Sequence, residues 1–347
     1  MKTVGLDLHK VNSQVCVLDE NGEVEREARF ATDRRQFARV FGKRPRMRIL
    51  LESSTESEWV ARYVEQLGHE VIVADPGYAP MYPRRVRRVK TDRRDARALA
   101  EACRSGTFRR AHRCSEPHRQ LRAQLTVRET VVRTRSRFIS VVRTLLRAEG
   151  LRVRSGDAAT FAERVQEVEI GARLDALVDP LLDLIDDLSE RIKTMDHELG
   201  LLARSDEVLR RLRTVPGVGP VTAITFKAVV DRVERFKRAH QLESYLGLVP
   251  GERSSGEKRH RGRLTKQGNA RARWLLVEAA WTAFRGKAPG TAGLAAWGNR
   301  IAARRGKRIA LVAMARKLAG ILFALWRHQV DFDPGRIRVS KLTLRAA

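Results

Sequence analysis

The order of apolar segments in the first 75 residues constrains the fold most. TVGLDLH and SQVCVLDENGE have the patterning of two strands joined by a short turn, and the second ends in the hairpin signal Asp19-Glu20-Asn21-Gly22 before EVEREARFA. The stretches RMRILLE, SEWVARYVEQLG and HEVIVAD then give strand, helix and strand. A three-stranded meander followed by strand–helix–strand predicts a mixed α/β sheet within residues 1–110.

The rest of the chain is predominantly helical in its patterning. Residues 117–212 contain two long stretches with apolar side chains at helical spacing, which predict an antiparallel helix pair or coiled coil. Such an element serves as a spacer or an oligomerisation surface more often than as a chemical site. Residues 213–330 predict a third, mostly helical region, and residues 332–347 a frayed basic tail.

The charge of the chain limits its partners. A net charge of +28, from 69 Lys and Arg against 41 Asp and Glu, favours a polyanion as partner, and nucleic acid is the first candidate. A membrane surface is the alternative, but no long basic amphipathic helix, no uninterrupted membrane-spanning apolar run and no signal peptide is evident. The three scattered cysteines indicate reduced thiols in a cytosolic protein.

Four acidic residues suggest a metal site. Asp7 lies within an apolar strand and Glu52 ends another, while Asp92 and Asp95 share one face of a predicted helix. Each has an ordinary alternative: a hydrogen-bonded strand residue, a charge at a loop entry, or a helix N-cap. Together, with no His or Cys expected nearby, these carboxylates favour Mg²⁺ or Mn²⁺ and two-metal phosphoryl transfer.

Two further segments have features of phosphate binding. The basic run RRVRRVK precedes the paired aspartates, and VPGVGPVTA resembles a helix-hairpin-helix turn whose backbone N–H groups could approach a phosphate. The alternatives are a solvated charged face and a tight turn without a ligand. The candidate residues are Arg84, Arg85, Arg87, Arg88, Gly217 and Gly219.

The segment ERSSGEKRHRGRLTKQGN predicts a flexible, basic, phosphate-binding loop. From the residues alone, its Ser-Ser-Gly is more often a turn than a nucleophile, because a reactive serine needs a base or a metal to activate it. The basic residues expected to hold nucleic acid are Lys258, Arg259, Arg261, Arg263, Lys266 and Arg271.

The order of these motifs resembles one family along nearly the whole chain. GLDLHK, the ILLE strand, KTDRRDARALA, VPGVGPVTA and YLGLVPGERSSGEKRHRGRLTKQGNARAR occur as in the DEDD-type transposases of the IS-one-ten group of insertion sequences. These are bridge-RNA-guided recombinases.

The resemblance implies a RuvC/RNase H-like N-terminal domain in which Asp7, Glu52, Asp92 and Asp95 bind divalent metal. It implies a nucleophilic serine before Gly256, which corresponds to Ser255, with Ser254 as the neighbouring alternative. It further implies target and donor DNA, a structured noncoding guide RNA, and a homo-oligomer, a dimer or tetramer, in which the two sites meet across protomers.

Two other functions stay open at this point. A RuvC-like nuclease that resolves Holliday junctions would use the same acids with water as the nucleophile. A non-catalytic nucleic-acid-binding protein would need only the glycine turn and the helix pair.

Overall fold

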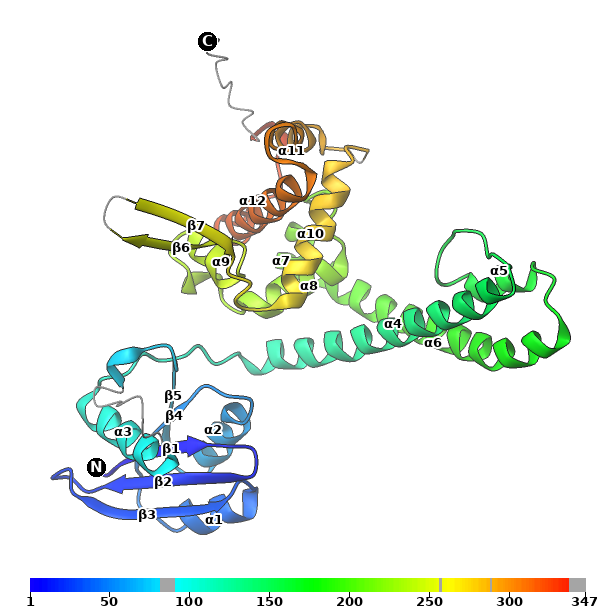
Figure 1. Ribbon diagram of the computed structural model, residues 1–347. Helices are drawn as coiled ribbons and strands as arrows, with labels where there is room; N and C mark the ends of the chain where they lie inside the picture. Colours follow the sequence, from blue (N-terminus) through cyan, green and yellow to red (C-terminus); the bar gives the residue numbers. More distant parts are fainter. Residues whose placement is uncertain (82–90, 256–257, 288, 337–347) are drawn as a thin grey trace. The chain divides into compact units, whose positions relative to one another are not determined.

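The computed structural model describes residues 1–81, 91–255, 258–287 and 289–336, with the backbone alone at 79, 253–255 and 258–261 (Figure 1). The chain divides into two compact units, unit 1 (Met1–Cys114) and unit 2 (Ser115–Ala347). The predicted basic residues Arg84, Arg85, Arg87 and Arg88 and the tail from residue 337 onward lie outside the described residues.

Unit 1 is built on a five-stranded mixed sheet with the strand order β3-β2-β1-β4-β5. The first three strands form an antiparallel meander, and β4 and β5 continue the sheet in parallel with β1. This confirms the mixed α/β prediction. The strands are β1 (Thr3–Leu8), β2 (Asn12–Leu18), β3 (Val24–Ala31), β4 (Arg48–Glu52) and β5 (Glu70–Ala74).

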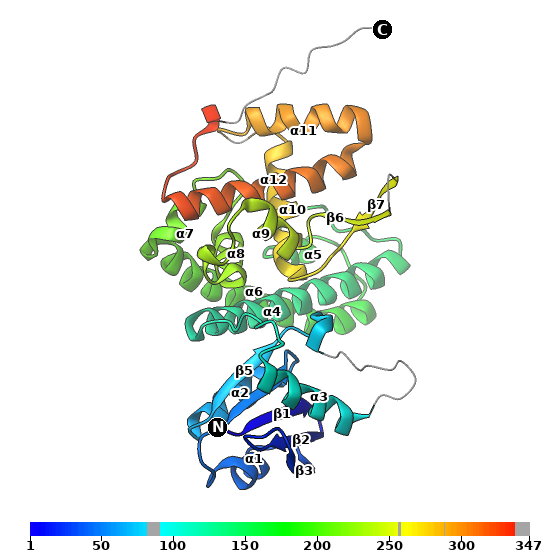
Figure 2. The same ribbon diagram turned by 90° about the vertical axis from the view of Figure 1, so that its left-hand side faces the viewer.

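Helices cover both faces of this sheet (Figure 2). Helices α1 (Arg34–Phe41) and α2 (Ser57–Gln66) pack on the face that carries Leu6 and Leu51. Helix α3 (Asp92–Ser105) packs on the other face, where Leu50 contacts the Leu99 cluster. Successive strand residues therefore alternate between two buried layers, because side chains point to opposite faces of a sheet.

Unit 2 begins with two long antiparallel helices, α4 (Glu116–Ala148) and α6 (Ala172–Ser205). Their direction follows from two side-chain pairs: Arg128 binds Asp196, and seven residues further along α4, Arg135 donates to Ser189, seven residues earlier on α6. Short helix α5 (Phe161–Gln166) closes a separate apolar cluster between them.

The remaining helices of unit 2 share one larger core. Its members come from α6 onward and include Phe226, Leu276, Met314 and Leu318. The helices are α7 (Glu207–Leu212), α8 (Pro220–Val230), α9 (Ala239–Tyr245), α10 (Ala270–Phe284), α11 (Ala292–Arg305) and α12 (Lys307–His328).

Among the described residues, α12 is the one helix long and apolar enough to cross a membrane. Arg316 and Lys317 interrupt its apolar run, and Arg316 pairs with Glu243 of α9. Met314 and Leu318 on the same helix are fully buried in the core of unit 2. This packing is that of a core helix.

The predicted basic loop is instead an antiparallel hairpin of β6 (Pro250–Ser255) and β7 (Lys258–Leu264). The loop prediction failed because charged residues have low strand propensity and neither strand shows an apolar alternation. Two close backbone approaches anchor the base of the hairpin: a Cβ at Gly247 would lie 2.2 Å from the Gln267 oxygen, and one at Gly268 only 2.0 Å from the Tyr245 oxygen.

Candidate active site

Asp7 and Glu52 lie side by side at the ends of neighbouring strands. Strands β1 and β4 are parallel, with Leu6 opposite Leu51, so the next residue on each strand is one of these acids. Side-chain alternation places both on the face that α3 covers. The sheet register therefore brings together two acids that are 45 positions apart in the sequence.

Helix α3 approaches this face unusually closely at Gly5. A Cβ on Gly5 would lie 1.9 Å from the backbone oxygen of Ala96 and 2.3 Å from the nitrogen of Ala100. The absence of a side chain on β1 thus allows backbone-to-backbone contact between strand and helix. Because Gly5 and Asp7 share a face, this contact fixes where the first turn of α3 lies relative to Asp7.

The first turn of α3 carries Asp92 and Asp95. Thr91, and not Asp92, is the N-cap, since its side chain accepts a hydrogen bond from the backbone nitrogen of Arg94. The carboxylate of Asp92 is therefore not used as the cap. Asp95 is buried, with 9% of the residue exposed, whereas half of the Asp92 side chain is exposed.

The pKa of Asp7 responds to the charges of the other three acids. Burial raises the pKa of Asp7 above its usual value, the His9 imidazole lowers it, and the charges of Asp95, Asp92 and Glu52 raise it. The other three predicted acids thus all act on the carboxyl group of Asp7. Such a cluster of partly buried negative charge is costly to the fold without a counter-ion.

His9 is a component that the sequence analysis missed. Its Nε2 lies 3.2 Å from Asp7 Oδ2 and 3.3 Å from Asp92 Oδ1, so the imidazole bridges the two carboxylates. The expectation that no His lies near the acids was wrong. The signal was present in the sequence, because residues two apart at a strand end point to the same face.

The donor set fits a divalent metal ion. Asp7 Oδ2 is buried, and apart from its ion pair with the His9 imidazole it has no hydrogen-bond partner among the described groups, so it can also serve a cation as ligand. Asp7, His9 and Asp92 form the group of described residues whose ligand atoms all lie within 4.8 Å of one another. Glu52 and Asp95 are not in this tightest group and act on it through their charge.

The predicted serines lie in unit 2, at the end of β6. In the hairpin register, Ser255 is opposite Lys258 and Ser254 is opposite Arg259. The side chains of these four residues lie outside the described set, as does that of Arg261. Arg263 on β7 and Lys266, two residues beyond the end of β7, are exposed.

The remaining residues predicted to contact nucleic acid, Gly217, Gly219 and Arg271, differ in how closely other parts of unit 2 pack against them. Gly217, with φ +86°, packs its backbone against α10, and a Cβ there would lie 2.7 Å from the Ala279 oxygen. Gly219 is the N-cap of α8 and has open space around it. Arg271 lies on α10, where it pairs with Glu129 of α4.

Comparison with known proteins decides the family. Residues 209–293 match a family model described as "Transposase IS116/IS110/IS902 family", and residues 4–149 match a DEDD-type model described as "Transposase". A Pseudomonas aeruginosa protein, described as "Probable family 20 transposase", is 30% identical over 96% of this chain and 99% of its own length. The chain belongs to the IS110/IS116/IS902 family of transposases.

Other relatives that match along most of their length are also described as transposases. The transposase for insertion sequence element IS1111A of Coxiella burnetii is 29% identical, over 96% of this chain and 92% of its own. That for IS1328 of Yersinia enterocolitica is 26% identical, over 95% and 98%. This transposase is therefore a DNA phosphoryl-transfer enzyme with a DEDD domain. A DEDD domain implies an active site that uses divalent metal, and the acids around Asp7 lie in this domain.

Proposed function

We propose that this transposase cuts and rejoins DNA through a covalent serine–phosphate linkage, with Asp7, Glu52, Asp92 and Asp95 as its metal-binding residues. The observation that carries the proposal is the gathering of three carboxylates, those of Glu52, Asp92 and Asp95, around Asp7, whose buried Oδ2 has only the His9 ion pair among the described residues. Hard oxygen donors favour Mg²⁺ or Mn²⁺ at this position. The bound ion would supply Lewis-acid stabilisation of charge on the scissile phosphate.

The chain itself supplies the nucleophile. In the proposed step, Ser255 Oγ forms a bond to phosphorus while one bond from phosphorus to a deoxyribose oxygen breaks. The serine hydroxyl gives up its proton, and the departing oxygen takes one up. Reversal with a different strand end restores the serine and reseals DNA, so strand exchange needs no external energy source.

The basic hairpin would hold the nucleic-acid backbone beside this serine. Lys and Arg bind phosphates and release counter-ions, so binding weakens steeply as salt rises. This role is supported by the exposure of Arg263 and Lys266 and by the high net charge of the chain. The proposed contacts on this hairpin and directly after it are Lys258, Arg259, Arg261, Arg263 and Lys266.

Covalent trapping tests the serine mechanism. Labelled DNA carrying the element ends is incubated with protein, the structured RNA encoded beside the gene and Mg²⁺, then resolved on a denaturing gel. We expect a protein–DNA band with wild type and with Ser254→Ala, and none with Ser255→Ala. A band that persists in Ser255→Ala assigns the bond to another residue. Strand cleavage without any band, in wild type as well, would instead mean that water is the nucleophile.

RNA guidance and oligomerisation are the two remaining parts of the proposal. Recombination should require a structured RNA encoded beside the gene, and efficient recombination after complete RNA removal contradicts this. For assembly, the matched pair is Asp92→Asn and Ser255→Ala. If acids and serine act together across protomers, mixing these two inactive variants restores part of the activity, whereas an active site within one chain leaves the mixture inactive.

A further inference from the structure

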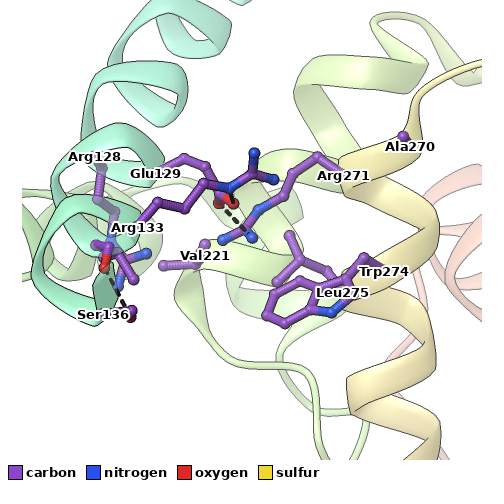
Figure 3. A pocket seen from close by; sticks show the side chains of 10 residues that line it. Arg128, Glu129, Arg133, Ser136, Val221, Ala270, Arg271, Trp274 and Leu275 are labelled. Atoms are coloured by element: carbon purple, nitrogen blue, oxygen red, sulfur yellow. Dashed lines mark hydrogen bonds and ion pairs between the residues drawn. The ribbon is translucent and has the colours of Figure 1, made fainter. Parts of the chain in front are cut away.

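A cavity in unit 2, whose lining includes neither the four acids nor the serines, is built by three helices (Figure 3). Helices α4 and α10 form its walls and α8 contributes one apolar residue. Its volume is about 780 Å³, within the roughly 300–1,000 Å³ of sites that enclose small organic groups. The lining residues that determine its charge and shape are Arg128, Glu129, Arg133, Val221, Arg271 and Trp274.

Positive charge dominates the lining. Arg133 donates to Glu129 at 2.7 Å, and Arg271 reaches across from α10 to the same carboxylate (Figure 3). Two guanidinium groups therefore share one acid, and Arg128, the third, has its partner Asp196 on α6. The Arg133 side chain remains 75% exposed. The cavity thus offers excess guanidinium groups to an anion, and guanidinium matches phosphate in a bidentate manner.

Trp274 gives the cavity an aromatic wall. Half of this residue is exposed, although large aromatic side chains are usually covered in folded proteins. The Arg271 guanidinium lies 4.5 Å from the ring centroid, which holds the indole by a cation–π contact. Leu275 and Val221 add apolar surface next to it. An indole that shares a cavity with the exposed Arg133 suits a nucleotide, because the ring can stack on the base while the guanidinium pairs with the phosphate.

We propose that this cavity binds an unpaired nucleotide of the nucleic-acid substrate, with the base stacked on Trp274 and the phosphate bound by Arg133 and Arg271. A base within a duplex has both faces covered by its neighbours, so this site selects single-stranded or extruded nucleotides. The proposal rests on nucleic acid being the partner of this chain, and it assigns a binding role independent of the serine and the acids.

Binding of short oligonucleotides tests the cavity directly. Fluorescence anisotropy is measured with the full chain, using a single-stranded DNA 12-mer, the same sequence as RNA, and a blunt DNA duplex. For Trp274→Ala we expect affinity for single strands to fall roughly 5- to 150-fold, with duplex affinity nearly unchanged. Trp274→Phe, which keeps an aromatic ring, should retain most of the affinity. The strand type that loses more identifies whether DNA or RNA occupies the site.

A matched pair of arginines tests the phosphate contact. Arg133→Gln should weaken single-strand binding and reduce its salt dependence. Arg137→Gln removes the same charge from an exposed position one turn further along α4, outside the cavity, and should have the smaller effect. Equal losses from both variants would mean that charge alone, and not the cavity, is responsible.

Three outcomes would overturn the proposal: unchanged single-strand affinity in Trp274→Ala, equal losses for strands and duplex, or equal losses in Trp274→Ala and Trp274→Phe. Because Trp274 is half exposed, circular dichroism should show the variants folded. Failure here is distinguishable from failure of the serine mechanism. The anisotropy assay is run without Mg²⁺ and involves no covalent step, so it reports on the cavity whether or not Ser255 forms a bond to DNA.

Discussion

Gly5 of β1 and Ala96 of α3 are in backbone contact, with the Ala96 oxygen 1.9 Å from where a Gly5 Cβ would lie. Asp7 is two residues beyond Gly5 on the same face of the strand, and Asp92 is one helical turn before Ala96. The contact therefore determines the separation between the strand acid and the helix acids. The spacing of the candidate metal ligands depends on a residue that has no side chain.

Gly5→Ala should consequently damage both stability and metal binding. The methyl group must displace α3 from the sheet, and overpacking of this kind costs about 1–3 kcal/mol or more. Thermal unfolding should show a lower midpoint, and Mg²⁺ should no longer raise it. Gly200→Ala on α6 is the control, because no atom beyond its own stretch of helix lies within 4 Å of its Cβ position and alanine favours a helix interior. A Gly5→Ala protein as stable as wild type, with an intact metal response, would contradict this account.

The sheet of unit 1 was predictable from the sequence because each strand has a local apolar signal and the turns between them have their own residues. The neighbourhood of Asp7 and Glu52 followed from that topology. The need for a residue without a side chain at position 5 could not be predicted, since it comes from contact with a helix some 90 residues later. The hairpin of residues 250–264 was missed because its strands are polar on both faces, and the cavity of Trp274 because its walls come from three separate helices.

His9, in contrast, could have been predicted from the sequence, because its spacing from Asp7 indicates that the two side chains share a face. The alternation that places Asp7 towards α3 also places the residue two positions later on that side. The catalytic roles of the four acids and of Ser255 stay predictions, and each depends on the experiments described.

Asp7→Asn should stabilise the metal-free protein. Because burial and the neighbouring acids raise the pKa of Asp7 above 3.8, the folded state holds this proton more tightly than the unfolded chain. Ionised Asp7 is then a cost to folding, and stability falls as pH rises through the raised pKa. In EDTA at pH 7, the variant should melt above wild type, and the gap should close at acidic pH.

Added Mg²⁺, in contrast, should stabilise wild type more than Asp7→Asn. Wild type should gain about 2.7 kcal/mol at a Mg²⁺ concentration of one hundred times the dissociation constant, and Asp7→Asn should gain little. Glu23→Gln removes an exposed carboxylate of unit 1 and serves as the control, with neither effect expected. A variant that melts below wild type in EDTA would show that Asp7 is a stabilising charge.

His9→Gln should separate two kinds of metal. Mg²⁺ prefers oxygen ligands, whereas Zn²⁺ binds imidazole readily. Since His9 Nε2 lies within 3.3 Å of both aspartates, the imidazole can join a Zn²⁺ site but is dispensable for Mg²⁺. Calorimetric titration should show Mg²⁺ affinity nearly unchanged and Zn²⁺ affinity lowered roughly tenfold or more. An equal loss for both ions would make His9 a ligand of the working metal.

Asp206→Ala should destabilise unit 2 in a pH-dependent way. Burial alone would raise the pKa of Asp206, but hydrogen bonds from Lys227 and from the Leu209 nitrogen lower it below 3.8. Its contribution is therefore present above pH 3.8 and lost as pH falls through the lowered pKa.

The measurement uses intrinsic fluorescence during urea unfolding, since four of the five tryptophans lie in unit 2. At pH 7 the loss in Asp206→Ala should be about 1 kcal/mol, the usual cost of removing an N-cap. Asp206→Asn keeps the cap but not the charge, so its loss should be smaller. If the two variants lose equal stability at pH 7, the charge on Asp206, and not the cap of α7, holds the junction between α6 and α7.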